Sequence, residues 1–397
     1  MNEVLKRTWA EISLDALEHN YQTIRKQLKE STKLCCVIKA DAYGHGAVRV
    51  AALYEAAGAD YFGVSNLEEA LQLRLGGIGT PILIMGYTPA KNADVLAKYK
   101  IAQCIYSAEY ASALSDYAVR YGVTVCVHIK IDTGMSRLGF DFQTDSDESA
   151  REVRKTCSLP NLDFEGVFTH FAVSDEGEDG REFTLSQYER FAYFLAELER
   201  DGITFRIRHC ANSAAVLEYP ETHMDMVRAG LILYGLYPSG KVKNRPLLIP
   251  ALELKSVVSH VKTVHSGYTV SYGREYTAAA DTRIATVPIG YADGYPRILG
   301  QRHADILIGG ARCTITGRVC MDQLMADVSS LPDVKTGDAV TLIGTDGSET
   351  ILADELAAFQ ESINYEVICD IGKRVPRVYL QHGKVESVTN QIVPEVY

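Results

Sequence analysis

The first two-thirds of the chain alternate short apolar runs with longer stretches in which apolar residues recur every three or four positions. The first helical stretch follows Ser13, a residue suited to cap a helix, with apolar positions at Leu14, Leu17, Tyr21, Ile24 and Leu28. Eight runs have the length and apolar content of buried strands: 33–40, 61–66, 81–86, 102–107, 125–132, 164–171, 205–213 and 224–230. Because helical stretches separate most of these runs, the pattern favours a (β/α)8 TIM barrel. A doubly wound open sheet is the alternative that the pattern leaves open.

The pattern changes near residues 241–250, where a region rich in β-branched and aromatic residues begins. Turn residues recur there every 8–12 positions or so, as in an all-β domain. The predicted strands are 282–290, 304–310, 311–317, 338–344 and 377–380, with one helix at 353–360. We therefore expect a barrel domain over residues 11–242 and a mostly β C-terminal domain over residues 243–385, and we find no clear pattern after residue 385.

Composition and charge narrow the class of protein. With 397 residues, 47% of them hydrophobic, the chain is long enough for two domains. A formal charge of −11 argues against nucleic-acid binding, which needs clustered Lys and Arg. The first residues lack the apolar core of a secretory signal, and the longest apolar candidate, 230–237, is too short to span a membrane. The nine cysteines show no zinc-site spacing. We expect a cytoplasmic protein without a metal site or membrane association.

Polar side chains stand at the ends of several predicted strands, where TIM-barrel enzymes build their active sites. Lys39 ends the first run and precedes the glycine-containing turn DAYGHG. An isolated lysine there is ordinarily a solvated edge residue, but a partly desolvated lysine has a lowered pKa and can form a Schiff base. The other polar or glycine residues at strand ends are Arg137, His170, Asn212, Ser213, Arg228 and Gly230.

The loops after the seventh and eighth strands are the usual phosphate site of this fold. Ser213 opens the run SAAVLEY, and the N–H groups of a helix N-terminus there would favour an anion. Gly230 lets the backbone approach a ligand closely. A lysine for an aldehyde, a phosphate site and neighbouring cations together indicate a site for pyridoxal 5'-phosphate.

Nine motifs, in order and over nearly the whole chain, resemble those of the alanine racemases. They are VIKADAYGHG (37–46), HIKIDTGMSRLG (128–139), FTHFA (168–172), CANSAA (210–215), MVRAGLILYG (226–235), VSYGREY (270–276), IGYADGYPR (289–297), GRVCMDQ (317–323) and INYEV (363–367). The resemblance implies a pyridoxal-phosphate-dependent racemase that interconverts L- and D-alanine and supplies D-alanine for peptidoglycan. It also implies that an N-terminal strand within residues 1–10 joins the C-terminal domain, and that a homodimer shares its active sites across the interface.

The resemblance assigns the two bases that racemisation requires. Lys39 would hold the cofactor and act on one face of the substrate α-carbon, and Tyr272 of the other subunit would act on the opposite face. In the family, a histidine matching His170 bridges this tyrosine and the arginine matching Arg228, a cationic network that favours the phenolate. Arg228 would face the pyridine nitrogen, leave it unprotonated and so weaken the electron sink.

The remaining roles concern ligand binding. By the resemblance Tyr43, Asn212, Ser213, Tyr365 and the backbone at Gly230 and Leu231 would bind the cofactor, chiefly its phosphate. Arg137 would bind the substrate carboxylate, with the Met321 backbone amide from the other subunit, and Tyr291 would line the entrance. The lysine matching Lys130 is carbamylated in some members of the family, and the sequence leaves this open for Lys130.

Three other functions are alternatives to an alanine racemase. A non-catalytic pyridoxal-phosphate carrier of the same barrel type lacks a second domain, whereas residues 243–385 and Tyr272 are present. A related decarboxylase should carry an acidic partner for the pyridine nitrogen and a triple-glycine phosphate loop, and neither is visible. A racemase of serine or of broad specificity stays open, although Tyr365 favours alanine because serine-directed relatives tend to have a smaller polar residue there.

Overall fold

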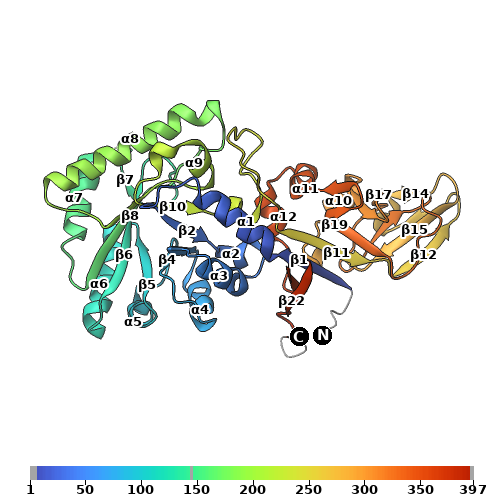
Figure 1. Cartoon of the computed structure of the whole chain (residues 1–397), viewed down its shortest axis with the longest axis horizontal. Helices are drawn as coiled ribbons and strands as arrows, with labels where there is room; N and C mark the ends of the chain where they lie inside the picture. Colours follow the sequence, from blue (N-terminus) through green and yellow to red (C-terminus); the bar gives the residue numbers. More distant parts are fainter. Residues whose placement is uncertain (1–6, 144–145, 394–397) are drawn as a thin grey trace. The chain divides into compact units, whose positions relative to one another are not determined.

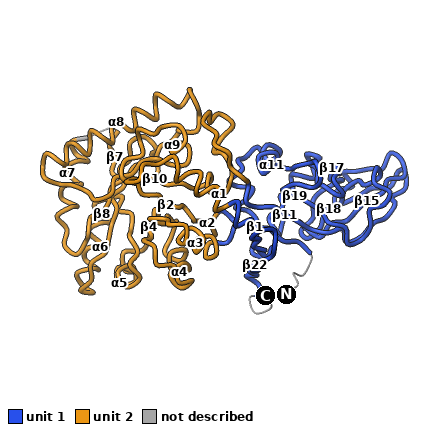
Figure 2. Tube along the Cα trace, in the orientation of Figure 1, with its two compact units in different colours: residues 1–16, 43–46, 250–397 blue, residues 17–42, 47–249 orange. Residues whose placement is uncertain are grey.

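The computed structural model describes residues 7–143 and 146–393, and the chain divides into two compact units (Figures 1 and 2). The barrel unit comprises residues 17–42 and 47–249, and the C-terminal unit comprises residues 1–16, 43–46 and 250–397. The short segment 43–46, which follows Lys39 closely, belongs to the C-terminal unit, although the residues directly before and after it in the sequence belong to the barrel unit.

Among the described residues the sheet of the barrel unit has nine strands: the short β7 (Phe140–Asp141) lies off the main path, and eight parallel strands form the barrel itself. They are β2 (Lys33–Val37), β3 (Tyr61–Val64), β4 (Ile82–Ile84), β5 (Ile101–Ile105), β6 (Val125–Asp132), β8 (Leu162–Phe168), β9 (Ile207–His209) and β10 (Met226–Ala229). The sheet runs in chain order, and β10 pairs with β2. Hydrogen bonds from Asp225 N to Arg208 O (3.1 Å) and from Arg228 N to Ala211 O (3.0 Å) connect the last two strands. The TIM barrel is confirmed, since a doubly wound sheet would have two open edges.

Helices alternate with these strands, as the apolar periodicity predicts. They are α1 (Leu14–Arg25), α3 (Ala47–Ala56), α4 (Leu67–Leu75), α5 (Ala93–Lys98), α6 (Ala108–Tyr121), α7 (Ser146–Thr156), α8 (Glu178–Arg200) and α9 (Ser213–Glu218). The segment labelled α2 (Lys39–Tyr43) is not one of these predicted helices, because its backbone angles are left-handed. Ser13 Oγ accepts a hydrogen bond from Ala16 N at 3.1 Å, which confirms the predicted cap of α1. Buried side chains from six strands pack together inside the barrel: Cys35, Tyr61, Leu83, Ala102, Ile207 and Met226. The interior is thus a filled core that fixes the strand ends.

The C-terminal unit is mostly β. Its strands are β1 (Thr8–Ser13), β11 (Leu252–Val257), β12 (His260–Val264), β13 (Thr269–Val270), β14 (Tyr276–Thr277), β15 (Thr282–Val287), β16 (Asp305–Ile308), β17 (Ala311–Thr314), β18 (Leu324–Asp327), β19 (Ala339–Asp346), β20 (Glu349–Ile351), β21 (Arg377–Gln381) and β22 (Lys384–Thr389), with short helices α10 (Ile298–Gln301), α11 (Ala353–Gln360) and α12 (Asn364–Cys369). Helix α11 has the predicted bounds. Strand β22 lies mostly in the segment for which the sequence shows no pattern.

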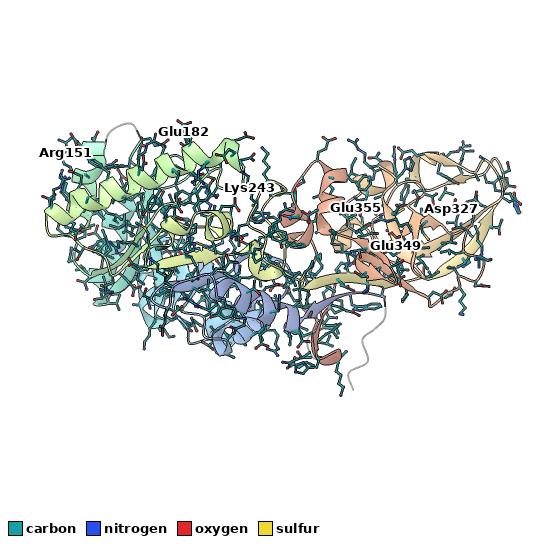
Figure 3. The ribbon with its side chains drawn as sticks, turned by 45° about the horizontal axis from the view of Figure 1, so that its top comes forward. Arg151, Glu182, Lys243, Asp327, Glu349 and Glu355 are labelled. Atoms are coloured by element: carbon teal, nitrogen blue, oxygen red, sulfur yellow. The ribbon has the colours of Figure 1, made fainter. Side chains whose placement is uncertain are left out.

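Strand β1 belongs to the C-terminal unit and extends to Ser13, three residues beyond the predicted end of the N-terminal strand. β1 pairs antiparallel with β11 and parallel with β21, so it lies between two strands that are far away in sequence. The predicted strand also covered residues 1–6, which lie outside the described residues. Elsewhere in this unit Arg312 binds Glu349 (Nε–Oε2 2.9 Å) and Glu355 (Nη1–Oε1 2.6 Å), two acidic residues labelled close together in Figure 3. Within the described residues, no helix is long and apolar enough to cross a bilayer.

Candidate active site

Lys39 lies at the carboxyl end of β2, directly before a left-handed turn. Ala40, Asp41 and Ala42 have φ of 52°, 54° and 54°, a region that costs a residue with a β-carbon about 1–2 kcal/mol. We call these three residues the left-handed turn. Two hydrogen bonds within the same loop stabilise the left-handed turn. Ala42 N donates to Ile38 O (3.0 Å), and Ala47 N donates to Asp41 Oδ1 (2.8 Å). Such strain persists only where the surroundings hold it, and it occurs most often at functional sites.

Several predicted residues of the barrel unit gather around His170, which is half-buried just after β8. Burial and surrounding positive charge hold the pKa of His170 well below its ordinary value. The charge comes from four side chains: Arg228, Arg137, Lys130 and Lys39. His170 is therefore neutral near pH 7, and the four cations around it form a site suited to a ligand with several negative charges.

Arg228, on β10, is almost completely buried, and both terminal nitrogens of its guanidinium donate hydrogen bonds. Nη2 donates to the carbonyl oxygens of Thr169 (2.8 Å) and Cys210 (3.0 Å) and lies 3.3 Å from His170 Nδ1. Nη1 donates to His209 Nδ1 at 2.8 Å. Burial lowers the pKa of Arg228 to about 10, so the guanidinium stays protonated at neutral pH.

A chain of hydrogen bonds runs from Arg228 through the barrel interior. His209 Nε2 lies 2.9 Å from His128 Nδ1, and His128 Nε2 lies 3.2 Å from Glu165 Oε2. Because a guanidinium only donates, His209 must accept at Nδ1 and donate from Nε2, and His128 in turn donates from Nε2 to Glu165. Burial lowers the pKa of both histidines, and the bond from His128 lowers that of Glu165 to about 2. The Glu165 carboxylate thus fixes the neutral tautomers of His128 and His209. As a result, His209 Nδ1 always presents a lone pair to Arg228.

The loops after β9 and β10, where the sequence predicts a phosphate site, contact each other. The Ser213 hydroxyl accepts a hydrogen bond from Gly230 N at 2.8 Å. Asn212 caps α9, accepting from Ala215 N at 3.1 Å, and the helix begins at Ser213 as predicted. Leu231 follows Gly230 at the start of a buried 3-10 turn, η3 (Leu231–Tyr234). The hydrogen bond from Gly230 to Ser213 therefore holds the two loops in direct contact.

Arg137 and Lys130 belong to β6 and the loop that follows it. Asp132 Oδ1 accepts three backbone hydrogen bonds, from Gly134, Met135 and Ser136, at 2.9–3.0 Å, which fixes the loop just before Arg137. Lys130 is 4% exposed and donates to Ile131 O at 2.7 Å. Burial, the largest effect, lowers the pKa of Lys130 to about 8.

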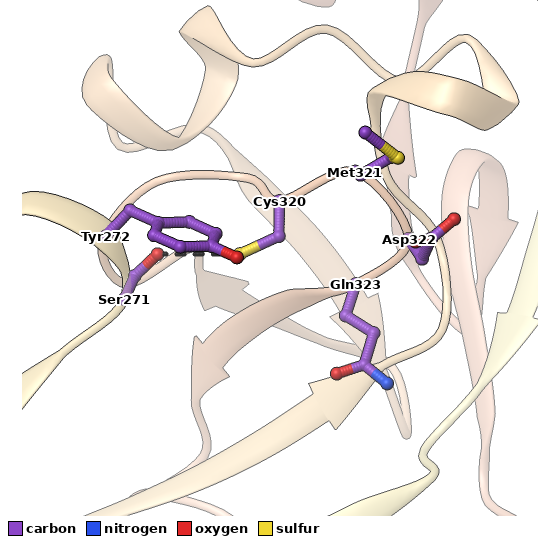
Figure 4. Close-up of a pocket in the computed structure, with 6 residues that line it drawn as sticks. All are labelled: Ser271, Tyr272, Cys320, Met321, Asp322 and Gln323. Carbon is purple, nitrogen blue, oxygen red and sulfur yellow. Dashed lines mark hydrogen bonds between the residues drawn. The ribbon is translucent and has the colours of Figure 1, made fainter.

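The other predicted residues lie in the C-terminal unit. The rings of Tyr43 and Tyr365 are adjacent, with centroids 6.0 Å apart. Tyr272 is 68% exposed on a 3-10 turn, η4 (Tyr272–Arg274), beside a pocket of about 490 Å³. The residues that line this pocket are Ser271, Tyr272, Cys320, Met321, Asp322 and Gln323 (Figure 4).

A close backbone contact brings Tyr291 to the same pocket wall. Tyr291 N donates to Cys320 O at 3.1 Å, and Ala292 N donates to Met321 O at 3.0 Å. The contact needs glycine at position 290, since a β-carbon there would lie 2.2 Å from Cys320 O. Tyr272, Tyr291 and Met321 are therefore held near one another, with large parts of all three side chains exposed.

The predicted residues thus form one group in the barrel unit and two separate ones in the C-terminal unit, the Tyr43–Tyr365 pair and the residues at the pocket beside Tyr272. Sequence reasoning missed the residues that hold them: Glu69, Asp132, His128, Glu165 and His209. A signal for part of this set was present, because His128, Lys130 and Asp132 alternate with apolar residues in VCVHIKID. A strand buried on both faces that carries polar residues at every second position places them all on one face.

The fold is a TIM barrel, and four positively charged side chains, among them Lys39, act on His170 just after β8. Family models described as the alanine racemase N-terminal and C-terminal domains match residues 12–238 and 251–379. Alanine racemase 1 of Clostridium acetobutylicum is 44% identical, with 98% of this chain and 99% of the relative covered. The chain belongs to the alanine racemase family.

Solved structures agree with this assignment. An alanine racemase of Clostridium difficile 630 is 42% identical with a TM-score of 0.92, covering 98% of this chain and 99% of that one. A histidine racemase of Leuconostoc mesenteroides is 31% identical with a TM-score of 0.83, covering 96% of this chain and 100% of that one.

Proposed function

We propose that this protein interconverts L- and D-alanine with pyridoxal 5'-phosphate bound in the barrel unit, and that its product serves peptidoglycan synthesis. The observation that carries the proposal is the gathering of Lys39, Arg137 and Arg228 around a neutral His170. The donor set fits the cofactor: an amine for its aldehyde, the N–H groups of two loops for its phosphate, and a guanidinium for its ring nitrogen. A cytoplasmic location and a homodimer belong to the same proposal.

In this function the chemistry that the cofactor supplies when bound is the withdrawal of electrons from the substrate α-carbon. Arg228, held by four partners, would face the ring nitrogen of the bound cofactor and keep its proton, because its pKa of about 10 leaves it protonated at neutral pH. Lys39 Nζ and Tyr272 Oη of a second subunit remove and return the α-proton on opposite faces. Arg137 binds the substrate carboxylate.

The binding roles of the other residues follow the family. Ser213, Gly230 and Leu231, with Asn212 capping the helix, would bind the phosphate, and Tyr43 and Tyr365 would contribute their hydroxyl groups. Met321 would offer its backbone amide to the substrate, and Tyr291 would stand at the entrance. These assignments rest on the matching motifs together with the proximity of the residues within each unit.

The substrate is tested by incubating the purified protein with a panel of L-amino acids and separating the enantiomers of each product. We expect D-alanine to form fastest, because a small side chain leaves room beside the bulky Tyr365. The panel includes serine, the alternative substrate left open by the sequence, and histidine. A higher kcat/KM for either of these than for alanine would replace the proposed substrate.

We also propose that Lys130 is carbamylated. A pKa of about 8 leaves about half of the Lys130 amines neutral at pH 8, and only the neutral amine attacks carbon dioxide. The nitrogen bonds to the carbon and releases a proton, so a cation becomes an anion that attracts Arg137. With 13C-labelled bicarbonate at pH 8, a carbamate signal is expected in the wild type, and it should weaken as the pH falls through 8.

The control for this experiment is the exposed Lys241. Its ion pairs with Glu176 and Asp179 raise its pKa, so little of it is neutral. The carbamate signal should persist in Lys241→Ala and vanish in Lys130→Ala. A signal retained in Lys130→Ala would assign the modification to another amine.

A further inference from the structure

Glu69 joins the loop that carries Lys39 to the neighbouring loop of the barrel. Its Oε1 accepts a hydrogen bond from Ala40 N at 2.8 Å, and its Oε2 accepts one from Ser65 N at 2.7 Å. Ala40 follows Lys39 directly, and Ser65 follows the end of β3. One carboxylate therefore connects the first residue of the left-handed turn to the adjacent strand end.

Glu69 lies in the first turn of α4, where its carboxylate can reach backbone N–H groups that precede the helix. Asn66 is the N-cap of α4, and its Oδ1 accepts from Glu69 N at 2.9 Å. In the common capping box, a glutamate at this third position bonds back to the N-cap backbone N–H. Here Glu69 binds Ser65 N, one residue earlier, and also reaches a different loop. The hydrogen bond from Ala40 N to Glu69 is therefore not part of the capping of α4.

The backbone strain of the left-handed turn makes a stabilising contact such as the one from Glu69 to Ala40 N necessary. Four consecutive residues with β-carbons, from Ala40 to Tyr43, have positive φ, and the first glycine comes only at Gly44. Asp41 holds the far end of the turn through Ala47 N, and Glu69 holds the near end through Ala40 N. A loop released at the near end would relax toward ordinary backbone angles and change where the Lys39 amine points.

We infer that Glu69 is a positioning residue for Lys39. It contacts neither substrate nor cofactor, and it acts by fixing the peptide that follows the lysine. The inference rests on the proposed role of Lys39 in holding the cofactor. Among the described residues, nothing else contacts Ala40 N through a side chain.

The test compares Glu69→Gln with Glu68→Gln in the full-length protein. Glutamine serves as well as glutamate at the third position of a capped helix, so α4 should still form. Its amide nitrogen cannot accept, so one of the two N–H groups, at Ala40 or Ser65, loses its partner. Glu68 is exposed in the same helical turn, which makes Glu68→Gln a matched control.

The first measurement is amide hydrogen exchange in a peptide covering residues 38–46, made before any cofactor is added. We expect exchange at least about tenfold faster in Glu69→Gln than in the wild type and in Glu68→Gln, with urea unfolding unchanged. Unchanged exchange in this peptide would overturn the inference. Faster exchange throughout the barrel, together with weaker resistance to urea, would also overturn it by showing general destabilisation.

The second measurement is the rate at which added pyridoxal 5'-phosphate becomes fixed to Lys39 by borohydride. We expect this rate to fall several-fold in Glu69→Gln and to stay at the wild-type value in Glu68→Gln. A normal rate in Glu69→Gln would mean that the turn does not position the lysine. If the wild type fixes no cofactor at Lys39, the proposed function fails, whereas the exchange result still decides whether Glu69 holds the turn.

Discussion

Lys39→Ala is expected to abolish racemisation, with a loss of at least about 10⁴-fold in kcat/KM. The substitution removes the amine that binds the cofactor and, at the same time, one of the two groups that exchange the α-proton. It should do so without unfolding the protein, because the Lys39 side chain is partly exposed at the end of β2. The measurement is D-alanine formation from L-alanine, with circular dichroism to verify the fold.

Lys33→Ala provides the control for this experiment. Lys33 is exposed at the opposite end of the same strand, so its loss should leave activity near the wild-type value. Substantial activity in Lys39→Ala would contradict the assignment. The next candidate for cofactor attachment would then be Lys130, because its pKa is lowered and its charge, like that of Lys39, acts on His170.

The barrel was predictable because its strands are buried on both faces. Each buried strand is a short apolar run, and each surface helix has a periodic apolar face, so the alternation was visible along the chain. Strand β22 was not visible, since Lys384, Val385 and Glu386 at its start are all exposed. The place of β1 between β11 and β21 was likewise not readable from local pattern, because pairing between distant segments leaves no periodicity in either.

Those residues of the candidate site were predictable that combine a reactive or charged side chain with a place at the end of an apolar run. Lys39, Arg137 and Arg228 are charged residues at the ends of apolar runs, which is why the pattern selected them. Glu69 lies on a helix among other acidic residues, and its contact with Ala40 depends on how two loops meet. Tyr272, on an exposed turn, was found only through the motif VSYGREY, since an exposed tyrosine carries no local signal of catalysis.

A mixed dimer made from two inactive variants should regain activity. If Tyr272 acts across the interface, each active site combines Lys39 of one chain with Tyr272 of the other. Homodimers of Lys39→Ala are then inactive, and homodimers of Tyr272→Phe nearly so. In a mixed dimer one site contains both substitutions, while the other pairs an intact Lys39 with an intact Tyr272. Co-expression of the two variants should therefore restore activity that neither has alone.

The size of the recovery follows from the pairing of subunits. With random pairing in a closed twofold dimer about half of the dimers are mixed, and one of the two sites in each is intact. Activity should therefore approach about a quarter of the wild-type value. Native mass spectrometry shows whether mixed dimers have formed. If they form and activity stays at background, Tyr272 does not act across the interface. The second base would then have to come from the same chain as Lys39, and the exposure of Tyr272 would need another explanation.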